Sequence, residues 1–127
     1  YSPLGRGALT GKLPAPDALD GDDFRRQLPR FQQDAWLSNQ ALVATLEQMA
    51  ALRGATAAQL ALAWLLAQSP QIVPIPGARQ LSRVRENAAA ANLVLSADEV
   101  AGIGAALHPD RVAGARYGAP ELALVNR

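Results

Sequence analysis

The chain has 127 residues, half of them hydrophobic, and a formal net charge of +1 from 12 basic and 11 acidic side chains. This length allows one hydrophobic core of ordinary size, and the balanced charge excludes a general attraction to nucleic acid or to an anionic membrane. The sequence contains no cysteine and a single histidine, His108, which excludes disulfides, thiolate chemistry and histidine-rich metal sites. No apolar run approaches the roughly 18 residues of a membrane span, and no signal sequence is recognisable. We therefore expect a soluble, cytoplasmic protein with neither a nucleic-acid nor a membrane partner.

The N-terminal residues combine turn signals with a long irregular segment. In the stretch from Tyr1 to Gly7, an aromatic residue is followed by a proline and two glycines, which is typical of a sharp turn at the end of a strand. Residues 8–37 contain three prolines and an acidic cluster, and therefore predict a long loop. Loops of this length within compact domains are usually functional or disordered. We expect a lid, with Phe24 and Phe31 as its anchor points.

Two helices are predicted in the next part of the chain. Ser38 is a suitable N-cap for a first helix whose apolar residues recur at helical spacing up to Gly54. Thr56 and Gln59 form a capping box at the start of a second, strongly apolar helix. This second helix should end near Pro70, because proline cannot continue a helix.

The C-terminal half predicts a strand and two more helices. Residues 72–76 are rich in β-branched residues and predict a buried strand, and residues 80–91 predict a basic helix. A further capping box at Ser96 begins a helix that runs to about Leu107. Residues 108–127 predict a variable tail with little periodicity. The predicted order is βαβα, an α/β class in which the strands are parallel and the crossover is right-handed.

The turn between the predicted strand and the basic helix has the character of a phosphate site. Gly77 has no Cβ and allows a ligand to approach the backbone, and the unpaired N–H groups of a helix N-terminus attract an anion. Arg79 and Arg83 add positive charge within about one turn. As a bare pattern this is weak, because both arginines could belong to a solvated helix face. Glu86 could likewise pair with Arg83 on the helix surface.

Several separate motifs resemble the aldo-keto reductase family over about the first 107 residues. They are Tyr-Ser-Pro-Leu-Gly-Arg-Gly at 1–7, Leu-Thr-Gly-Lys at 9–12, Asp-Phe-Arg-Arg at 23–26, Pro-Arg-Phe at 29–31, Ala-Gln-Leu-Ala-Leu-Ala-Trp at 58–64, Val-Pro-Ile-Pro-Gly at 73–77 and Glu-Asn at 86–87. The resemblance implies the C-terminal portion of a (β/α)8 TIM barrel, from strand 7 through the helices after strand 8. It also implies a nicotinamide cofactor, usually NADPH, and reduction of aldehydes and ketones.

The resemblance implies a role for each matching residue. It implies that Tyr1 stacks on the nicotinamide ring and that Glu86 and Asn87 reach the adenine. Arg79 and Arg83 would read the 2′-phosphate, because Gly77 and Ala78 stand where some members have a Lys-Ser pair, and NADP is therefore expected over NAD. The full set of cofactor-binding residues that it implies is Tyr1, Ser2, Leu4, Gly5, Arg6, Gly77, Ala78, Arg79, Arg83, Glu86 and Asn87.

The catalytic groups of the family have no counterpart in this chain. The family's aspartate, tyrosine, lysine and histidine lie on earlier strands, and His108 follows the last predicted helix. We therefore expect a piece of a longer protein, inactive without the N-terminal half of the barrel, and a small-molecule carbonyl substrate for the whole. Two alternatives remain open. The chain could belong to a regulatory subunit that binds NADPH without turnover, or it could be a helical interaction module.

Overall fold

The structure is a computed structural model that describes residues 1–124, and in this part of the chain all regular elements are helical. The last three positions of the predicted tail 108–127 lie outside the described residues. The α-helices are α1 (Gln33–Leu52), α2 (Ala57–Gln68), α3 (Leu81–Ala89), α4 (Ala97–Ala106) and the short α5 (Ala119–Leu122). The 3-10 turns are η1 (Gly5–Thr10), η2 (Pro16–Ala18), η3 (Phe24–Gln27), η4 (Pro29–Phe31), η5 (Ala90–Asn92) and η6 (Pro109–Arg111).

Helix α1 begins at Gln33 with Gln32 as its N-cap, six residues before the predicted cap, so Ser38 lies inside the helix. Aromatic packing accounts for the earlier start. The rings of Phe31 and Trp36 stack with centroids 5.9 Å apart, and both side chains are buried. The C-terminus is as predicted: Gly54 has a φ of +60°, and the N–H of Ala55 donates to the carbonyl of Ala50 at 3.0 Å, as in a Schellman motif.

The two predicted capping boxes are confirmed. Thr56 accepts from the backbone N–H of Gln59 and the Gln59 side chain accepts from the backbone N–H of Thr56, which begins α2. Ser96 and Glu99 do the same at the start of α4. Each box satisfies two backbone donors that a helix N-terminus otherwise leaves unpaired.

The hydrophobic core lies where α1, α2 and α4 meet. Leu46 and Leu60 are almost completely buried, and Ile103 of α4 packs against them. The indole Nε1 of Trp64 donates to the carbonyl of Val100 at 2.9 Å, so this half-buried side chain links α2 to α4 with its polar atom satisfied.

The predicted α/β class, a portion of a TIM barrel with parallel strands in βαβα order, is wrong for this structure. Residues 72–78 have neither helix nor strand, and no strand is found in residues 1–124. A strand needs a neighbouring backbone that completes its ladder. The described residues supply none, and Pro74 and Pro76 donate no hydrogen bond. Val73 is accordingly 79% exposed and Ile75 63% exposed.

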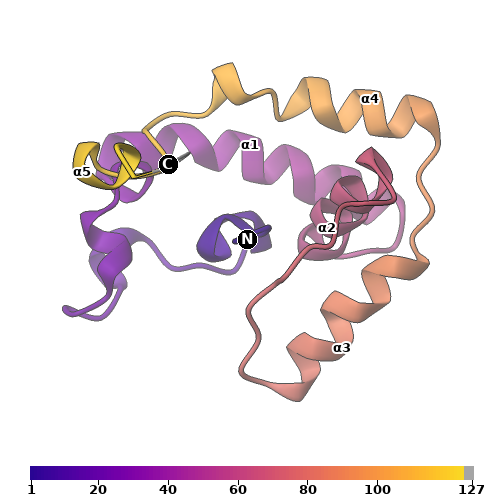
Figure 1. Cartoon of the computed structure of the whole chain (residues 1–127), viewed down its shortest axis with the longest axis horizontal. Helices are drawn as coiled ribbons and strands as arrows, with labels where there is room; N and C mark the ends of the chain where they lie inside the picture. Colours follow the sequence, from indigo (N-terminus) through magenta and orange to yellow (C-terminus); the bar gives the residue numbers. More distant parts are fainter. Residues whose placement is uncertain (125–127) are drawn as a thin grey trace.

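Figure 1 shows how the helices are arranged around the N-terminal segment. Helix α4 runs alongside α1, while α3 projects away from them at the end of the extended linker that follows α2 (Figure 1). Turn η1 packs against α1 and α2. Within residues 1–124 no single helix is long and apolar enough to cross a bilayer. Helices α1 and α2 have the required length and apolar composition only when they are taken together, and they meet at a bend of 86°.

Candidate functional site

A cavity of about 740 Å³ lies between the N-terminal segment and the linker that leads into α3. It brings together residues about 75 positions apart in the sequence: Ser2 and Arg6 line one side, and Gly77 and Arg83 line the other. Nine of the predicted cofactor residues contribute to the lining, namely Ser2, Leu4, Arg6, Gly77, Ala78, Arg79, Arg83, Glu86 and Asn87. The tertiary structure therefore joins the two predicted segments at one site.

The turn before α3 is open to a ligand. An added Cβ at Gly77 would meet nothing within 4 Å. The N-cap residue of α3, Gln80, makes no side-chain hydrogen bond to the N-terminal N–H groups of the helix. Backbone N–H groups in such a position, together with the helix dipole, favour a bound anion.

Arg83 and Glu86 form an ion pair beside this turn. Nη1 of Arg83 lies 2.7 Å from Oε2 of Glu86, whose side chain is only 15% exposed. Partial burial by itself raises the pKa of Glu86. Hydrogen bonds from Arg83 and Thr56 and the positive charges of Lys12 and Arg83 outweigh burial, and the pKa of Glu86 is lowered. The surface pairing that the sequence left open is thus present, and a phosphate at Arg83 would compete with Glu86.

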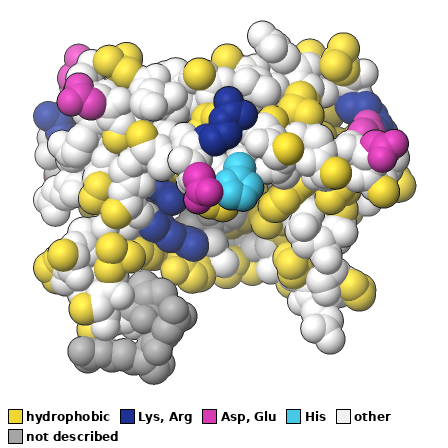
Figure 2. Space-filling model, turned by 90° about the horizontal axis from the view of Figure 1, so that it is seen from above, with side chains coloured by type: hydrophobic (Ala, Val, Ile, Leu, Met, Phe, Trp, Pro, Cys, Tyr) yellow, Lys and Arg dark blue, Asp and Glu magenta, His cyan; other side chains and the backbone are white. Residues whose placement is uncertain are grey.

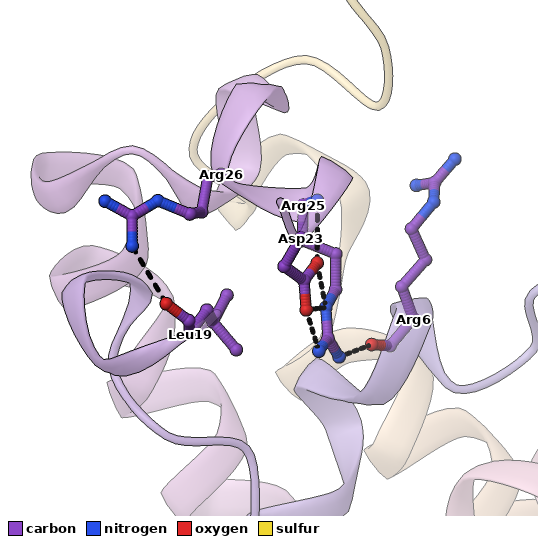
Figure 3. Close-up of polar contacts among 5 residues, drawn as sticks. All are labelled: Arg6, Leu19, Asp23, Arg25 and Arg26. Atoms are coloured by element: carbon purple, nitrogen blue, oxygen red, sulfur yellow. Dashed lines mark hydrogen bonds and ion pairs between the residues drawn. The ribbon is translucent and has the colours of Figure 1, made fainter. Parts of the chain in front are cut away.

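The opposite wall of the cavity is held in a strained backbone conformation. Arg6 has a φ of +57°, which residues other than glycine rarely adopt. Nη1 of Arg25 donates to the carbonyl of Arg6 at 3.1 Å (Figure 3). The same guanidinium donates hydrogen bonds to both carboxylate oxygens of Asp23, and these hydrogen bonds lower the pKa of Asp23 to about 2. The ion pair therefore orients Arg25, and Arg25 restrains Arg6.

The predicted lid, residues 8–37, is held by contacts within it and by hydrogen bonds from Arg25 and Arg30 to residues outside it. Nη1 of Arg26 donates to the carbonyl of Leu19 at 2.9 Å (Figure 3), which closes the acidic bend between them. Phe31 is buried as the predicted anchor, whereas Phe24 is 57% exposed and faces the guanidinium of Arg6 at 5.8 Å. Because α1 begins at Gln33, the irregular part is shorter than predicted.

Among the further residues that line the same cavity, four have polar side chains and are not among the predicted cofactor residues: Thr10, Lys12, Arg25 and Gln80. Lys12 and Arg25 add two cations to the lining. Lys12 belongs to the motif Leu-Thr-Gly-Lys and Arg25 to the motif Asp-Phe-Arg-Arg, so both residues lie in segments that resemble the family. The sequence does not predict that these two side chains lie near the glycine turn, because their position depends on how η1 and η3 are placed in the tertiary structure.

Two predicted residues lie elsewhere. Tyr1 is 64% exposed, and the guanidinium of Arg116 covers its ring at 4.5 Å from the centroid. Gly5 lines a second, mostly apolar cavity of about 590 Å³ bounded by α1, α2, α4 and the tail. Neither residue lines the first cavity, and their predicted contacts with a cofactor remain predictions.

The charged side chains of the described residues do not gather into a group typical of a metal centre. Groups of three or more potential metal ligands are absent from residues 1–124. The histidine lies on the face seen in Figure 2, beside an acidic side chain, and its Nδ1 is 3.4 Å from Oδ2 of Asp110.

Comparison with known proteins identifies the family. The model of the aldo/keto reductase family matches residues 1–108. The aldo-keto reductase yakc [NADP(+)] of Schizosaccharomyces pombe is 44% identical over 117 residues, which cover 92% of this chain and 34% of the relative. The aldo-keto reductase str7 of Strobilurus tenacellus is 42% identical over 103 residues, which cover 81% of this chain and 31% of the relative. The chain spans about a third of the length of these curated relatives, and it belongs to the aldo/keto reductase family.

Proposed function

We propose that this chain holds the cofactor in an NADPH-dependent aldo-keto reductase that reduces aldehydes or ketones. The observation that carries the proposal is the first cavity, which joins the glycine turn before α3 to the strained segment around Arg6. A relative whose name specifies NADP(+) supports the choice of cofactor.

The donor set of the cavity fits a phosphate-rich dinucleotide. Five cations line it: Arg6, Lys12, Arg25, Arg79 and Arg83. Guanidinium groups bind phosphate oxygens through charge-assisted hydrogen bonds, often two at once. The arginines at 79 and 83 would hold the 2′-phosphate, and those at 6 and 25 together with Lys12 would neutralise the pyrophosphate. Glu86 and Asn87 would supply polar contacts to the adenine.

The nicotinamide ring, when bound, would supply a hydride to the carbonyl carbon. The residues of this chain would bind and orient the cofactor and keep water away from its phosphates. Neither tyrosine nor histidine lines the first cavity within the described residues. As the family resemblance implies, a general acid for the carbonyl oxygen would come from the part of the protein outside this chain.

The decisive test is turnover by the protein that carries this chain. NADPH consumption in the presence of a simple aldehyde is followed optically, with a catalysed rate as the expected result. Tight NADPH binding without turnover would instead support the regulatory subunit. Failure of any nucleotide to protect the protein against heat would leave only the helical interaction module.

The first prediction concerns cofactor discrimination. We expect Arg83→Ala to weaken NADPH binding by about ten-fold to a hundred-fold, as expected for the loss of one charge-assisted hydrogen bond of about 1.5–3 kcal/mol. NADH binding should change far less, because NADH has no 2′-phosphate. Dissociation constants for both cofactors are the measurement. Arg85→Ala is the matched control, since Arg85 is exposed on the same helix and does not line the cavity. Equal weakening of both cofactors by Arg83→Ala would contradict the assignment.

The second prediction concerns the lid. We expect amide hydrogen exchange in residues 8–32 to slow when NADPH binds, because Lys12 and Arg25 would gain a phosphate partner and restrain η1 and η3. Helix α4, none of whose residues lines the first cavity, serves as an internal control that should not change. Unchanged exchange in residues 8–32 at saturating NADPH would remove the lid.

A further inference from the structure

Three arginines gather where the N-terminal segment, η4 and the C-terminal tail meet. Nε of Arg30 donates to the carbonyl of Gly114 at 3.2 Å, and Nη1 of Arg6 lies 3.5 Å from the carbonyl of Arg116. The ring of Tyr117 lies near two of these cations, with its centroid 4.7 Å from the guanidinium carbon of Arg6 and 6.0 Å from that of Arg116. Ring faces attract cations, so Tyr117 holds the two guanidiniums near each other.

The positive charge of this cluster is not balanced by carboxylates in residues 1–124. The ion pairs of the described residues use Arg25, Arg53, Arg83 and His108, and none includes a member of the cluster. Partial burial lowers the pKa of Arg30, and the nearby charges of Arg116 and Arg6 lower it further. Like charges at a half-buried position cost free energy unless an anion joins them. The cluster is therefore suited to receive an anionic group.

An apolar cavity adjoins the cluster. Arg30 and Arg6 line the second cavity of about 590 Å³, together with the aromatic side chains of Phe31, Trp36 and Trp64. Pro3 and Arg6 line both cavities, so the apolar cavity shares a wall with the proposed cofactor site. Tyr1, which the family resemblance places against the nicotinamide, lies under Arg116 at the same junction. A ligand in the second cavity would thus lie beside the proposed cofactor site.

We propose that the protein acts on carbonyl compounds that carry a carboxylate on an apolar body, and that Arg30 recognises this carboxylate. The proposal rests on the proposed function and adds the substrate class. Arg116 strengthens the positive potential at Arg30, while the aromatic side chains of the second cavity bury the apolar body of the substrate.

An oxyanion at this cluster could also come from a cofactor phosphate. Two observations favour the substrate. Arg30 does not line the first cavity, where the cations proposed for the cofactor phosphates lie. The walls around Arg30 are mostly apolar, whereas a dinucleotide needs a polar lining. The experiment therefore measures cofactor and substrate separately.

The test compares 4-formylbenzoate with its methyl ester, which has nearly the same shape but no charge. In the protein that carries this chain, Arg30→Gln should raise KM for 4-formylbenzoate by about ten-fold or more, as expected for loss of a charge-assisted hydrogen bond. KM for the ester and the Kd for NADPH should change less than about two-fold, within the range of a neutral surface substitution. Arg30→Lys should restore part of the affinity for the carboxylate. Arg111→Gln, on the same tail and exposed, is the matched control.

The following results would contradict the proposal. Equal rises in KM for acid and ester would show that Arg30 only supports packing. A rise in the Kd for NADPH would assign the cluster to a cofactor phosphate.

If neither compound is reduced, the proposed function fails, and a binding measurement then tests the recognition of the carboxylate by itself. Benzoate should then quench the fluorescence of Trp36 and Trp64, and Arg30→Gln should weaken this binding by about ten-fold. Benzoate binding that is unchanged by Arg30→Gln, or absent, contradicts the inference.

Discussion

Replacing Leu46 with alanine is expected to lower the free energy of unfolding by about 2–5 kcal/mol. Leu46 is fully buried and belongs to the cluster that contains Leu60 and Ile103, so the change removes contacts to three helices at once. The loss lies at the upper end of this range where the surrounding side chains cannot move to fill the cavity.

Leu52→Ala in the same helix is the matched control. Leu52 is 87% exposed, so its replacement should change the free energy of unfolding by less than about 0.5 kcal/mol. Urea unfolding of both variants, with equal slopes against denaturant concentration, gives the difference. Similar values for the two variants would contradict the position of the core between α1, α2 and α4.

Replacing Gly114 with alanine is expected to release the tail from η4. Gly114 has a φ of +80°, and an added Cβ would lie 2.8 Å from the carbonyl oxygen of Pro29 and 2.9 Å from the backbone of Arg30. The backbone strain alone costs about 1–3 kcal/mol, and the contact with backbone atoms cannot be relieved by a side-chain rotation. The hydrogen bonds of Asn39 to both backbone groups of Ala113, at 2.9 and 3.0 Å, would be lost with the docked conformation.

Hydrogen exchange in residues 109–118 measures this release. A loss of about 1–3 kcal/mol predicts exchange that is roughly five-fold to a hundred-fold faster, provided that exchange follows local opening. Gly21→Ala is the control, because an added Cβ at Gly21 meets nothing within 4 Å and its φ is not positive. If Gly114→Ala leaves tail exchange unchanged, the tail is not held at this position. If it accelerates exchange, KM for a carboxylate substrate should rise as well, since the carbonyl of Gly114 holds Arg30.

Local signals in the sequence were sufficient to predict the helix boundaries that depend on neighbouring residues. Thr56 and Ser96 begin helices because their side chains satisfy backbone donors within one turn. Gly54 ends α1 because it adopts a positive φ without strain. Ser38 was equally plausible as a cap but was overridden by the stacking of Phe31 on Trp36, which no local rule contains.

The sequence by itself also determined the family, because motifs such as those at 1–7 and 73–77 depend on residue identity and order alone. The sequence did not correctly predict the fold class. Residues 72–76 have the composition of a strand, but a strand exists only where a second backbone completes its hydrogen bonds, and residues 1–124 provide none. The tertiary structure alone decided that Lys12 and Arg25 join the glycine turn at one cavity and that the tail brings Arg116 to Tyr1. These contacts link residues far apart in the chain, and they follow from how the helices pack on Leu46 and Leu60, which no local pattern encodes.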